Sequence, residues 1–412
     1  MAKNGEYTLI LNSINVYSKY RPMSDAEMFI QNEFDKDASG FLLVGLGLGY
    51  HLAELLKLAG NKKIIVLPLA EQELTIFGKY AIDNKIINLP NVEIVRTNMI
   101  NNKILSNYQV IIPLSWMKAI GVSHPLYDFL EDIKERQMSY QFSSFLMEKN
   151  FRQNIVRDNI QSTYFKSRFQ SKFACLISAG PSLDETIATL EKIKDKFFIL
   201  CVGAALKPLL ARQIKPDAIV LSDATQLIIE QIEDTEYDGL LFYLSTTNSD
   251  LIESYKGKKC ILLQRGYTLS ETYAKQNDLD LFEVGGSVST VGLSLLKYMK
   301  FSTILLFGQD LGFKDNDTHS KFSPSNTAIT IQNKYNKILA NSGELINTRA
   351  DWNIFRRWFE REAMQSNVNI YNTAWHGTKI ANIPYISNDE IYAMYDSIAL
   401  ENDFKSALKE VK

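Results

Sequence analysis

Hydroxyl and acidic side chains flank an apolar run in residues 285–313, GGSVSTVGLSLLKYMKFSTILLFGQDLGF. The apolar residues of its first half repeat at helical spacing, so the segment predicts a helix followed by a buried strand. Gly286 and three hydroxyl residues stand at the helix start: Ser287, Ser289 and Thr290. Unpaired N–H groups at a helix start attract an anion. The strand runs into Gln309 and Asp310, so the pattern predicts an anion site beside polar side chains.

A reaction that takes a proton from its substrate needs a general base with a pKa near the working pH. Asp310 at the strand end and His319 in the loop DNDTHSK are the two candidates, with Gln309 beside them. His319 is alternatively a solvated loop residue among acids, and Asp310 and Asp223 are alternatively metal ligands. Hydroxyls and N–H groups at helix starts stabilise a negative charge without a metal. We therefore predict a site that uses no metal and no cofactor.

Turns after other apolar runs supply more groups of this kind. The turn Gly180-Pro181-Ser182 precedes a helical stretch in which Ser182 and Glu185 have the spacing of a capping box. Gly203 makes a close turn into a helix, and Asp223 ends the run DAIVLSD. Ligands of parallel sheets collect outside the carboxyl ends of the strands, so these turns predict one ligand cleft. A GxxxxGK[ST] loop is missing from the sequence, which argues against a P-loop nucleotidase.

Continuous apolar runs alternate with helical stretches, a pattern typical of parallel sheets covered by helices on both faces. The first block has strand candidates at 41–47, 62–69, 91–97 and 108–115, and a helix at 51–60. The second block has strand candidates in KFACLISAG, FFILCVG, DAIVLSD, GLLFYLST, KKCILLQRG, STILLFGQD and VNIYNTA. These patterns predict an α/β fold with two Rossmann-like parallel-sheet domains. The expected parts are a first domain at 1–140, a helical linker at 141–170, a second domain at 171–385 and a helical C-terminal segment at 386–412.

A glycine loop, GLGLG at residues 45–49, follows the first strand candidate and precedes a helix. A nucleotide-binding loop of this kind pairs with an acid at the end of the next strand, which holds the ribose. Pro68 stands at that place, and Glu71 comes late. We expect a structural loop that does not bind S-adenosylmethionine tightly, with nucleotide or nucleoside binding as the alternative.

The overall composition argues against several classes of function. The formal net charge of -2 gives no basic field for nucleic acid or an anionic membrane. Three separated cysteines without a CxxC motif indicate a reducing compartment, and the four histidines lack metal-ligand spacing. No apolar stretch approaches the roughly 20 residues of a membrane helix, and the N-terminus lacks a signal pattern. We therefore expect a cytoplasmic protein without a membrane span or a nucleic-acid partner.

Three segments of the second block resemble the motility-associated factor (Maf) family of bacterial flagellin glycosyltransferases. They are SAGPSLDE, VGAALKPLLARQIKPDAIVLSDA and residues 285–313, and their order and spacing match over about residues 170–385. NIYNTAWHGTKIANI, which contains Asn372, resembles the closing segment of that family, and GLGLGYHL resembles its first domain. A weaker similarity connects the chain with bacterial sialyltransferases, which use a CMP-activated sugar.

The resemblance implies transfer of a sialic-acid-like nonulosonic acid, pseudaminic or legionaminic, from a CMP donor to Ser or Thr of flagellin. The partners would be the CMP-activated sugar and flagellin, and the process would serve flagellar assembly and motility. The second domain would be of the sialyltransferase type, with Gln309 and Asp310 at the reacting edge. The resemblance assigns these residues to the donor site: Gly180, Pro181, Ser182, Gly203, Asp223, Gly286, Ser287, Ser289, Thr290 and Asn372.

The sequence departs from the sialyltransferase pattern and leaves two alternatives. Ala179 stands where the sialyltransferase turn has asparagine, and GELINTRADWNIF has no histidine where the sialyltransferase base is expected. The same domain family resembles archaeal 6-hydroxymethylpterin pyrophosphokinases, in which ATP and magnesium would use carboxylates such as Asp223 and Asp310. The other alternative is a non-catalytic protein that binds flagellin or a nucleotide sugar.

Overall fold

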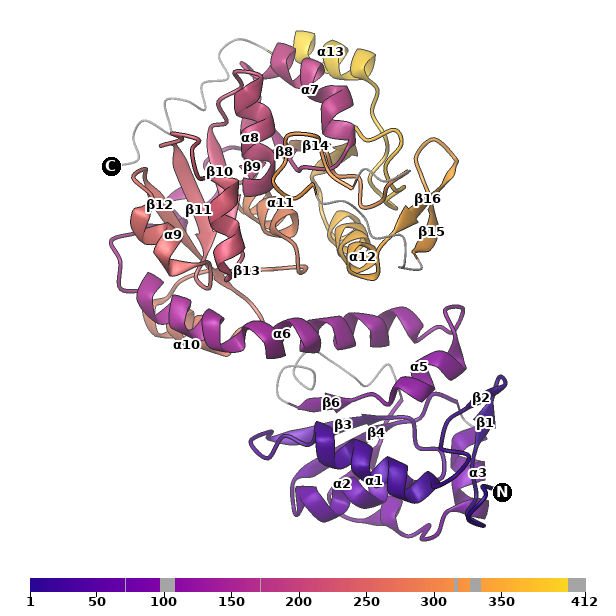
Figure 1. The fold of residues 1–412 in the computed structure, drawn as a ribbon. Coiled ribbons are helices and arrows are strands. Elements are labelled where there is room, and N and C mark those ends of the chain that lie inside the picture. Colours follow the sequence, from indigo (N-terminus) through magenta and orange to yellow (C-terminus); the bar gives the residue numbers. More distant parts are fainter. Residues whose placement is uncertain (71, 97–107, 171, 315–317, 327–334, 399–412) are drawn as a thin grey trace. The chain divides into compact units, whose positions relative to one another are not determined.

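A computed structural model describes residues 1–70, 72–96, 108–170, 172–314, 318–326 and 335–398 (Figure 1). The chain divides into two compact units, Met1–Met138 and Ser139–Lys412. The division falls inside helix α6, Tyr127–Asn154. Residues 399–412 of the expected C-terminal helical segment lie outside the described residues, as do 315–317 of the loop before His319.

The first unit contains a parallel sheet with strand order β5-β4-β3-β6. Its strands confirm the four strand candidates and are β3 (Gly40–Val44), β4 (Lys63–Leu67), β5 (Val92–Ile94) and β6 (Gln109–Ile111). Side chains of β3 alternate between two apolar cores, Phe41 and Leu43 in one and Leu42 and Val44 in the other. Both faces of the sheet are therefore buried, which is why the strands are continuous apolar runs.

The remaining elements of the first unit are helices and a short hairpin. The predicted helix at 51–60 is confirmed as α2, Tyr50–Ala59. The others are β1 (Ile10–Leu11), β2 (Ile14–Asn15), α1 (Pro22–Glu33), α3 (Gln72–Tyr80), the 3₁₀ helix η1 (Ile86–Asn88) and α5 (Leu114–Ile120).

The second unit contains a larger parallel sheet with strand order β13-β12-β11-β10-β9-β8-β14-β17, and β7 pairs with β12. The seven strand candidates are confirmed as β8 (Phe173–Ile177), β9 (Phe198–Val202), β10 (Ala218–Leu221), β11 (Leu240–Leu244), β12 (Lys259–Gln264), β14 (Thr303–Phe307) and β17 (Asn369–Asn372). The two strands that the pattern missed, β7 (Ile160–Gln161) and β13 (Leu281–Phe282), have two residues each.

The strand order of this sheet reverses beside β8. The chain runs from β8 through β9 to β13 on one side, and it then returns to form β14 on the other side of β8. Loops after neighbouring strands diverge at such a reversal, which leaves room for groups between them. Strand β14 pairs directly with β8, so the ends of these two strands lie side by side.

Helices cover the second sheet (Figure 1). Helix α11 (Val288–Tyr298) contacts β8, β9 and β10, and α7 (Ser182–Ile193) contacts β14 and α13 (Asn388–Ser397). The other elements are the 3₁₀ helices η3 (Ser162–Phe165) and η4 (Gln226–Gln231), the hairpin β15 (Asn336–Leu339) and β16 (Leu345–Thr348), and the helices α8 (Gly203–Ala211), α9 (Ser249–Ser254), α10 (Thr268–Asn277) and α12 (Ala350–Met364).

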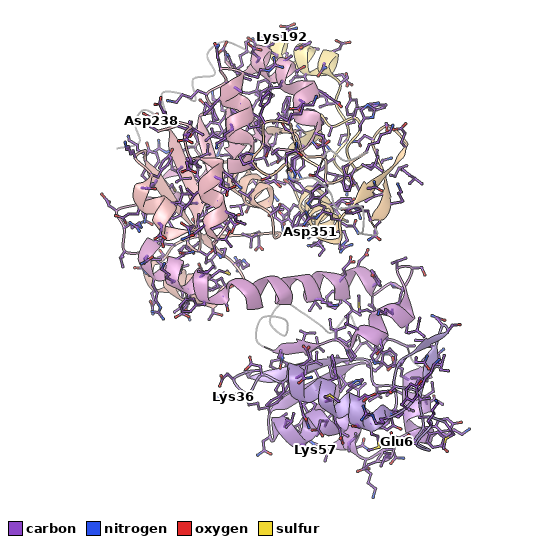
Figure 2. The ribbon with its side chains drawn as sticks, in the orientation of Figure 1. Glu6, Lys36, Lys57, Lys192, Asp238 and Asp351 are labelled. Carbon is purple, nitrogen blue, oxygen red and sulfur yellow. The ribbon has the colours of Figure 1, made fainter. Side chains whose placement is uncertain are left out.

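One apolar core joins the second sheet to these helices and reaches Ile391 and Ile398 near the end of the described chain. A capping box between Ser387 and Glu390 starts α13. Charged side chains such as Lys192 and Asp238 lie on the surface instead (Figure 2).

Candidate functional site

A pocket of about 470 Å³ opens at the carboxyl edge of the second sheet, and we call it the strand-end pocket. Its lining comes from the ends of β10, β11 and β12, from η4 and α6, and from the start of α11. The lining residues are Met147, Leu221, Ser222, Asp223, Ala224, Ile228, Gln231, Leu244, Thr246, Gln264, Val284, Gly286, Ser287, Val288 and Val291. Apolar side chains form much of the wall, interrupted by hydroxyl, amide and carboxylate groups. This mixture suits a ligand with a ring and a few polar substituents.

The start of α11 forms one wall of this pocket, as the sequence pattern predicts. Ser287 is the N-cap residue and lines the pocket. Thr290 is used internally, because its Oγ1 accepts a hydrogen bond from Gly285 N at 2.9 Å and donates one to Ser287 O at 2.5 Å. The hydroxyls of Ser287 and Ser289 lie 3.0 Å apart. First-turn N–H groups and the helix dipole favour an anion beside Ser287.

The two glycines before α11 allow helix α12 to pack closely against this loop. A Cβ atom at Gly285 would lie 2.4 Å from the Trp358 ring. Gly286 has a φ of +98°, and a Cβ atom there would lie 2.9 Å from the Phe355 ring. A larger residue at either position would displace the loop that carries Ser287.

Asp223 supplies the carboxylate of the strand-end pocket, at the end of β10. The side chain is exposed, and Thr225 N donates a hydrogen bond to its Oδ1 at 2.8 Å. Asn248 N donates a hydrogen bond to the backbone oxygen of Asp223 at 2.9 Å, which ties the β10 loop to the β11 loop. The carboxylate is therefore available to the hydroxyl groups of a ligand.

Asp310 lies outside this lining, at the reversal between β8 and β14, and is 5% exposed. Ser182 Oγ donates a hydrogen bond to Asp310 Oδ2 at 2.7 Å, and Ser182 N lies 3.2 Å from Oδ1. The predicted capping box between Ser182 and Glu185 is wrong, because α7 has Pro181 as its N-cap residue and no side-chain cap. A buried carboxylate needs donors, and the hydroxyl of Ser182 turns to Asp310 for this reason.

Burial raises the pKa of Asp310 to about 7, and the nearby Glu185 and Asp184 act in the same direction. The hydrogen bonds from Ser182 oppose this rise in pKa because they favour the ionised form. A carboxyl group with a pKa near neutrality has the basicity of a general base, although this one is enclosed.

Gln309, Asn372 and Gly180 complete the group around Asp310. Ser178 Oγ donates a hydrogen bond to Gln309 Oε1 at 2.8 Å, and Asn372 Nδ2 donates one to Gln309 O at 3.3 Å. A Cβ atom at Gly180 would lie 2.0 Å from Asp310 Oδ2, so only glycine fits there. These contacts hold the ends of β8, β14 and β17 together.

His319 is half-buried, which differs from a solvated loop position. Its ring packs edge-on against Trp352 with the ring centroids 5.9 Å apart, and Nδ1 lies 3.1 Å from Thr318 Oγ1. Burial, with a smaller effect from Arg349, lowers the pKa of His319 to about 4. The imidazole is therefore neutral at physiological pH.

Most of the predicted site residues form two groups. Asp223, Gly286 and Ser287 line the strand-end pocket, and Gly203 lies behind it, since a Cβ atom there would meet Gln231 and Leu221. The second group surrounds Asp310 and contains Gly180, Pro181, Ser182, Gln309 and Asn372. Strands β10 and β14 are separated by β9 and β8, which is three inter-strand spacings or roughly 14 Å.

Several lining residues are missing from the sequence prediction. Thr246 and Gln264 follow β11 and end β12, and Gln231 and Met147 come from η4 and α6. The hydroxyl run STTNS after β11 is a signal that could have indicated Thr246, because it stands at a strand end like Asp223. Met147 carries no such signal, because only the fold brings α6 to the sheet edge.

The N–H groups of the glycine loop in the first unit bind a side chain of the same protein, Glu73. Glu73 accepts hydrogen bonds from the N–H groups of Leu46 and Gly47 at 2.6 and 2.9 Å. Its other carboxylate oxygen accepts from Leu69 N at 2.6 Å and Ala70 N at 3.1 Å. Burial raises the pKa of Glu73. The N–H groups that would bind a phosphate are thus already paired.

Within the described residues, no group of three or more His, Cys, Asp and Glu side chains is arranged to hold a metal ion. A search of the same residues finds no helix that is both long enough and apolar enough to cross a membrane.

Comparisons with known proteins find one family model that matches part of the second unit. The family described as 6-hydroxymethylpterin diphosphokinase MptE-like matches residues 147–316, less than half of the chain. The matched residues include the complete lining of the strand-end pocket and Asp310, but neither His319 nor Asn372. No curated protein matches the chain. A similar solved structure is the Maf glycosyltransferase from Magnetospirillum magneticum AMB-1, with a TM-score of 0.48 and 14% identity over 99% of this chain and 72% of that one.

Proposed function

We propose that this protein is a glycosyltransferase that moves a nonulosonic acid, pseudaminic or legionaminic, from a CMP donor to Ser or Thr of flagellin. The observation that carries the proposal is the strand-end pocket, which joins an apolar wall, a carboxylate and a helix start in one cavity. A nucleotide has a ring, a sugar with hydroxyls and a phosphate, and these three features correspond to the three parts of the lining. The resemblance of SAGPSLDE and residues 285–313 to the Maf family selects CMP and the sugar.

Each part of the donor then has a binding group. The base packs against apolar side chains such as Leu221 and Leu244. The ribose hydroxyls donate hydrogen bonds to Asp223, as they do to strand-end acids in other nucleotide sites. The phosphate lies at the start of α11 beside Ser287, where N–H groups stabilise the charge that develops as CMP leaves.

Asp310 is the proposed general base, and it takes the proton of the acceptor hydroxyl of flagellin. The rise of its pKa to about 7 matches the basicity that a general base needs. His319 is the alternative base, but the low pKa of its ring makes it a weak proton acceptor. In this scheme the acceptor enters at the end of β14 while the donor occupies the pocket at β10 to β12.

The test is a transfer assay with purified protein, flagellin and CMP-pseudaminic or CMP-legionaminic acid. Mass spectrometry should detect flagellin carrying the mass of one nonulosonic acid per modified Ser or Thr. Mass spectrometry should also compare flagellin from cells that have this protein with flagellin from cells that lack it. CMP binding without any transfer would indicate that the protein binds a nucleotide sugar and is not a transferase.

A second candidate function is ATP- and magnesium-dependent diphosphate transfer to a pterin, favoured by the family match to residues 147–316. The strand ends that carry Asp223 and Asp310 lie roughly 14 Å apart, so the two carboxylates do not share one ion in this arrangement. Titration of the protein with CMP, AMP and magnesium–ATP separates the candidates. A clear preference for magnesium–ATP would favour the kinase.

A further inference from the structure

Thr246 is a buried hydroxyl residue in the wall of the strand-end pocket, and the proposed function assigns it no role. It stands two residues after the end of β11 and is 2% exposed. The polar groups around it determine in which direction its hydroxyl can donate a hydrogen bond.

Gln264, at the end of β12, determines the direction of a hydrogen-bond chain. Gln264 Oε1 accepts a hydrogen bond from Ser245 Oγ at 3.1 Å, and Gln264 Nε2 donates one to Thr246 Oγ1 at 2.9 Å. Because Ser245 Oγ donates to Gln264, the 2.8 Å contact between Ser245 and Ser270 is donated by Ser270. The chain therefore runs from Ser270 through Ser245 and Gln264 to Thr246.

Thr246 Oγ1 accepts at the end of this chain, so its own proton must point elsewhere. The Thr246 side chain makes no second hydrogen bond among the described residues, and the space beside it is the pocket. A buried hydroxyl proton without an acceptor is costly in free energy. A ligand that supplies an acceptor atom at this place would remove that cost.

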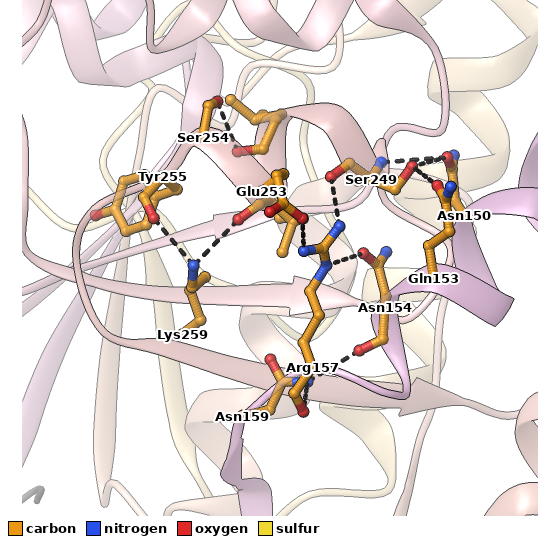
Figure 3. Close-up of polar contacts among 12 residues, drawn as sticks. Asn150, Gln153, Asn154, Arg157, Asn159, Ser249, Glu253, Ser254, Tyr255 and Lys259 are labelled. Carbon is orange, nitrogen blue, oxygen red and sulfur yellow. Dashed lines mark hydrogen bonds and ion pairs between the residues drawn. The ribbon is translucent and has the colours of Figure 1, made fainter.

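The backbone of Thr246 is also held in place, by an asparagine of helix α6. Asn150 Nδ2 donates hydrogen bonds to Thr246 O at 3.1 Å and to Ala224 O at 3.0 Å. Its Oδ1 accepts from Ser249 N at 3.1 Å and Ser249 Oγ at 3.0 Å, as Figure 3 shows. Asn150 thus joins two loops that line the pocket.

We infer that Thr246 donates a hydrogen bond to a neutral acceptor atom on the nucleotide base, and that Gln264 and Asn150 are positioning residues for it. This inference rests on the proposed nucleotide pocket. A neutral acceptor is favoured over a phosphate because the described lining contains no Lys, Arg or His near Thr246. A carbonyl oxygen or an unprotonated ring nitrogen of a pyrimidine has this character.

The test is calorimetric titration of CMP and of ribose 5-phosphate, which lacks the base. Thr246→Val keeps the shape and removes the donor, and it should weaken CMP binding about tenfold while ribose 5-phosphate binding stays within twofold. Thr246→Ser should restore CMP binding to within about threefold. Thr247→Val is the matched control, because Thr247 is buried next to Thr246 but its hydroxyl bonds to Leu221 O.

Gln264→Glu tests the direction of the chain. A carboxylate only accepts, so it would take the Thr246 proton away from the pocket while the threonine stays in place. We expect it to weaken CMP binding at least as much as Thr246→Val. Normal CMP binding by Thr246→Val, or equal weakening of CMP and ribose 5-phosphate, would overturn the inference.

Titration of the wild-type protein separates a failure of the proposed CMP donor from a failure of the role of Thr246. Binding of AMP or ATP in place of CMP would reject the proposed donor, and the same variants would then test Thr246 with that nucleotide. Absence of binding for all three nucleotides would reject both the pocket and the role of Thr246.

Discussion

Among the individual residues, Asp310 is a buried carboxyl group that accepts hydrogen bonds and still has a raised pKa. It is enclosed at the reversal between β8 and β14, and Ser182 donates hydrogen bonds to it. Burial nevertheless raises its pKa to about 7. Burial of such a group destabilises the folded state. Carboxyl groups with a perturbed pKa occur often at functional sites, and we propose that this one transfers a proton.

Asp310→Asn should lower the turnover of transfer by about 10²-fold or more, since an amide cannot take the acceptor proton. CMP affinity should change little, because the strand-end pocket does not include Asp310. His319→Ala is the paired variant and should retain most of the turnover. A large loss with His319→Ala and a small loss with Asp310→Asn would assign the base to the histidine.

The pH dependence of turnover separates the same two bases. A base must be unprotonated, so Asp310 predicts a turnover rate that rises as the pH increases through about 7. His319 predicts a rise near pH 4 and a flat profile above it. The profile should be measured with saturating donor between pH 5 and 9, and a flat profile over this range would contradict the role of Asp310.

Protein stability should show the linked effect. The folded-state pKa of Asp310 lies above the ordinary aspartate value of 3.8, so the folded state favours the protonated carboxyl. Its contribution to stability is present below about pH 4 and is lost as the pH rises towards 7. Urea unfolding at pH 4.5 and 7.5 should therefore show that Asp310→Asn gains stability relative to wild type as the pH rises. Parallel behaviour of the two proteins would contradict the raised pKa.

At the scale of elements, loops after strands are held by side chains from distant parts of the chain. Glu73 from α3 pairs with the N–H groups of the GLGLG loop, and Asn150 from α6 joins the loops after β10 and β11. In the first case the paired groups are removed from ligand binding. In the second case the same kind of contact shapes a pocket.

The occupied glycine loop predicts that the protein does not bind S-adenosylmethionine. Titration calorimetry at micromolar protein should give no binding heat. Glu73→Gln should lower the free energy of unfolding by about 2 kcal/mol, because the amide replaces one charged acceptor of N–H groups. Micromolar binding of S-adenosylmethionine by the wild-type protein would contradict the structural role of this loop.

Asn150→Asp removes the two N–H donors to Ala224 O and Thr246 O and keeps the acceptor for Ser249. We expect CMP affinity to fall about tenfold, because the loops after β10 and β11 lose their common donor. Asn154→Asp is the control, since Asn154 Nδ2 binds Ser245 O and Thr247 O, which do not line the pocket. Equal losses of CMP affinity in both variants would indicate a general effect on folding.

At the scale of the whole molecule, the chain consists of two compact units with separate parallel sheets and separate apolar cores. The proposed donor pocket lies in the second unit. A ligand stabilises the part of a protein that binds it, by about 2.7 kcal/mol at a concentration of 100 Kd.

Hydrogen exchange should therefore show CMP protecting only the second unit. Amides in β10, β11 and the start of α11 should exchange more slowly with CMP, while amides in β3 and β4 should be unchanged. Mass spectrometry of peptic fragments gives this comparison directly. Protection of β3 and β4 alone would move the nucleotide site to the GLGLG loop.

The class of fold and most of the second sheet can be predicted from the sequence. Strands buried on both faces must be apolar throughout, so β8 to β12, β14 and β17 are visible as continuous runs. The same rule locates the strand end at Asp223, and the helical spacing of the apolar residues after it locates the helix start at Gly286 and Ser287. The structure brings all three residues to one pocket. The two-residue strands β7 and β13 leave too little pattern to detect.

Which strand ends are neighbours depends on the tertiary structure. The order β10-β9-β8-β14 separates Asp223 from Asp310, and no local pattern encodes that order, because pairing depends on how distant segments pack. The partner of Ser182 was decided in the same way, since a local capping box with Glu185 competes with a buried carboxylate 128 residues away. Local spacing describes groups close in sequence, whereas burial creates the need for hydrogen bonds that only distant residues satisfy.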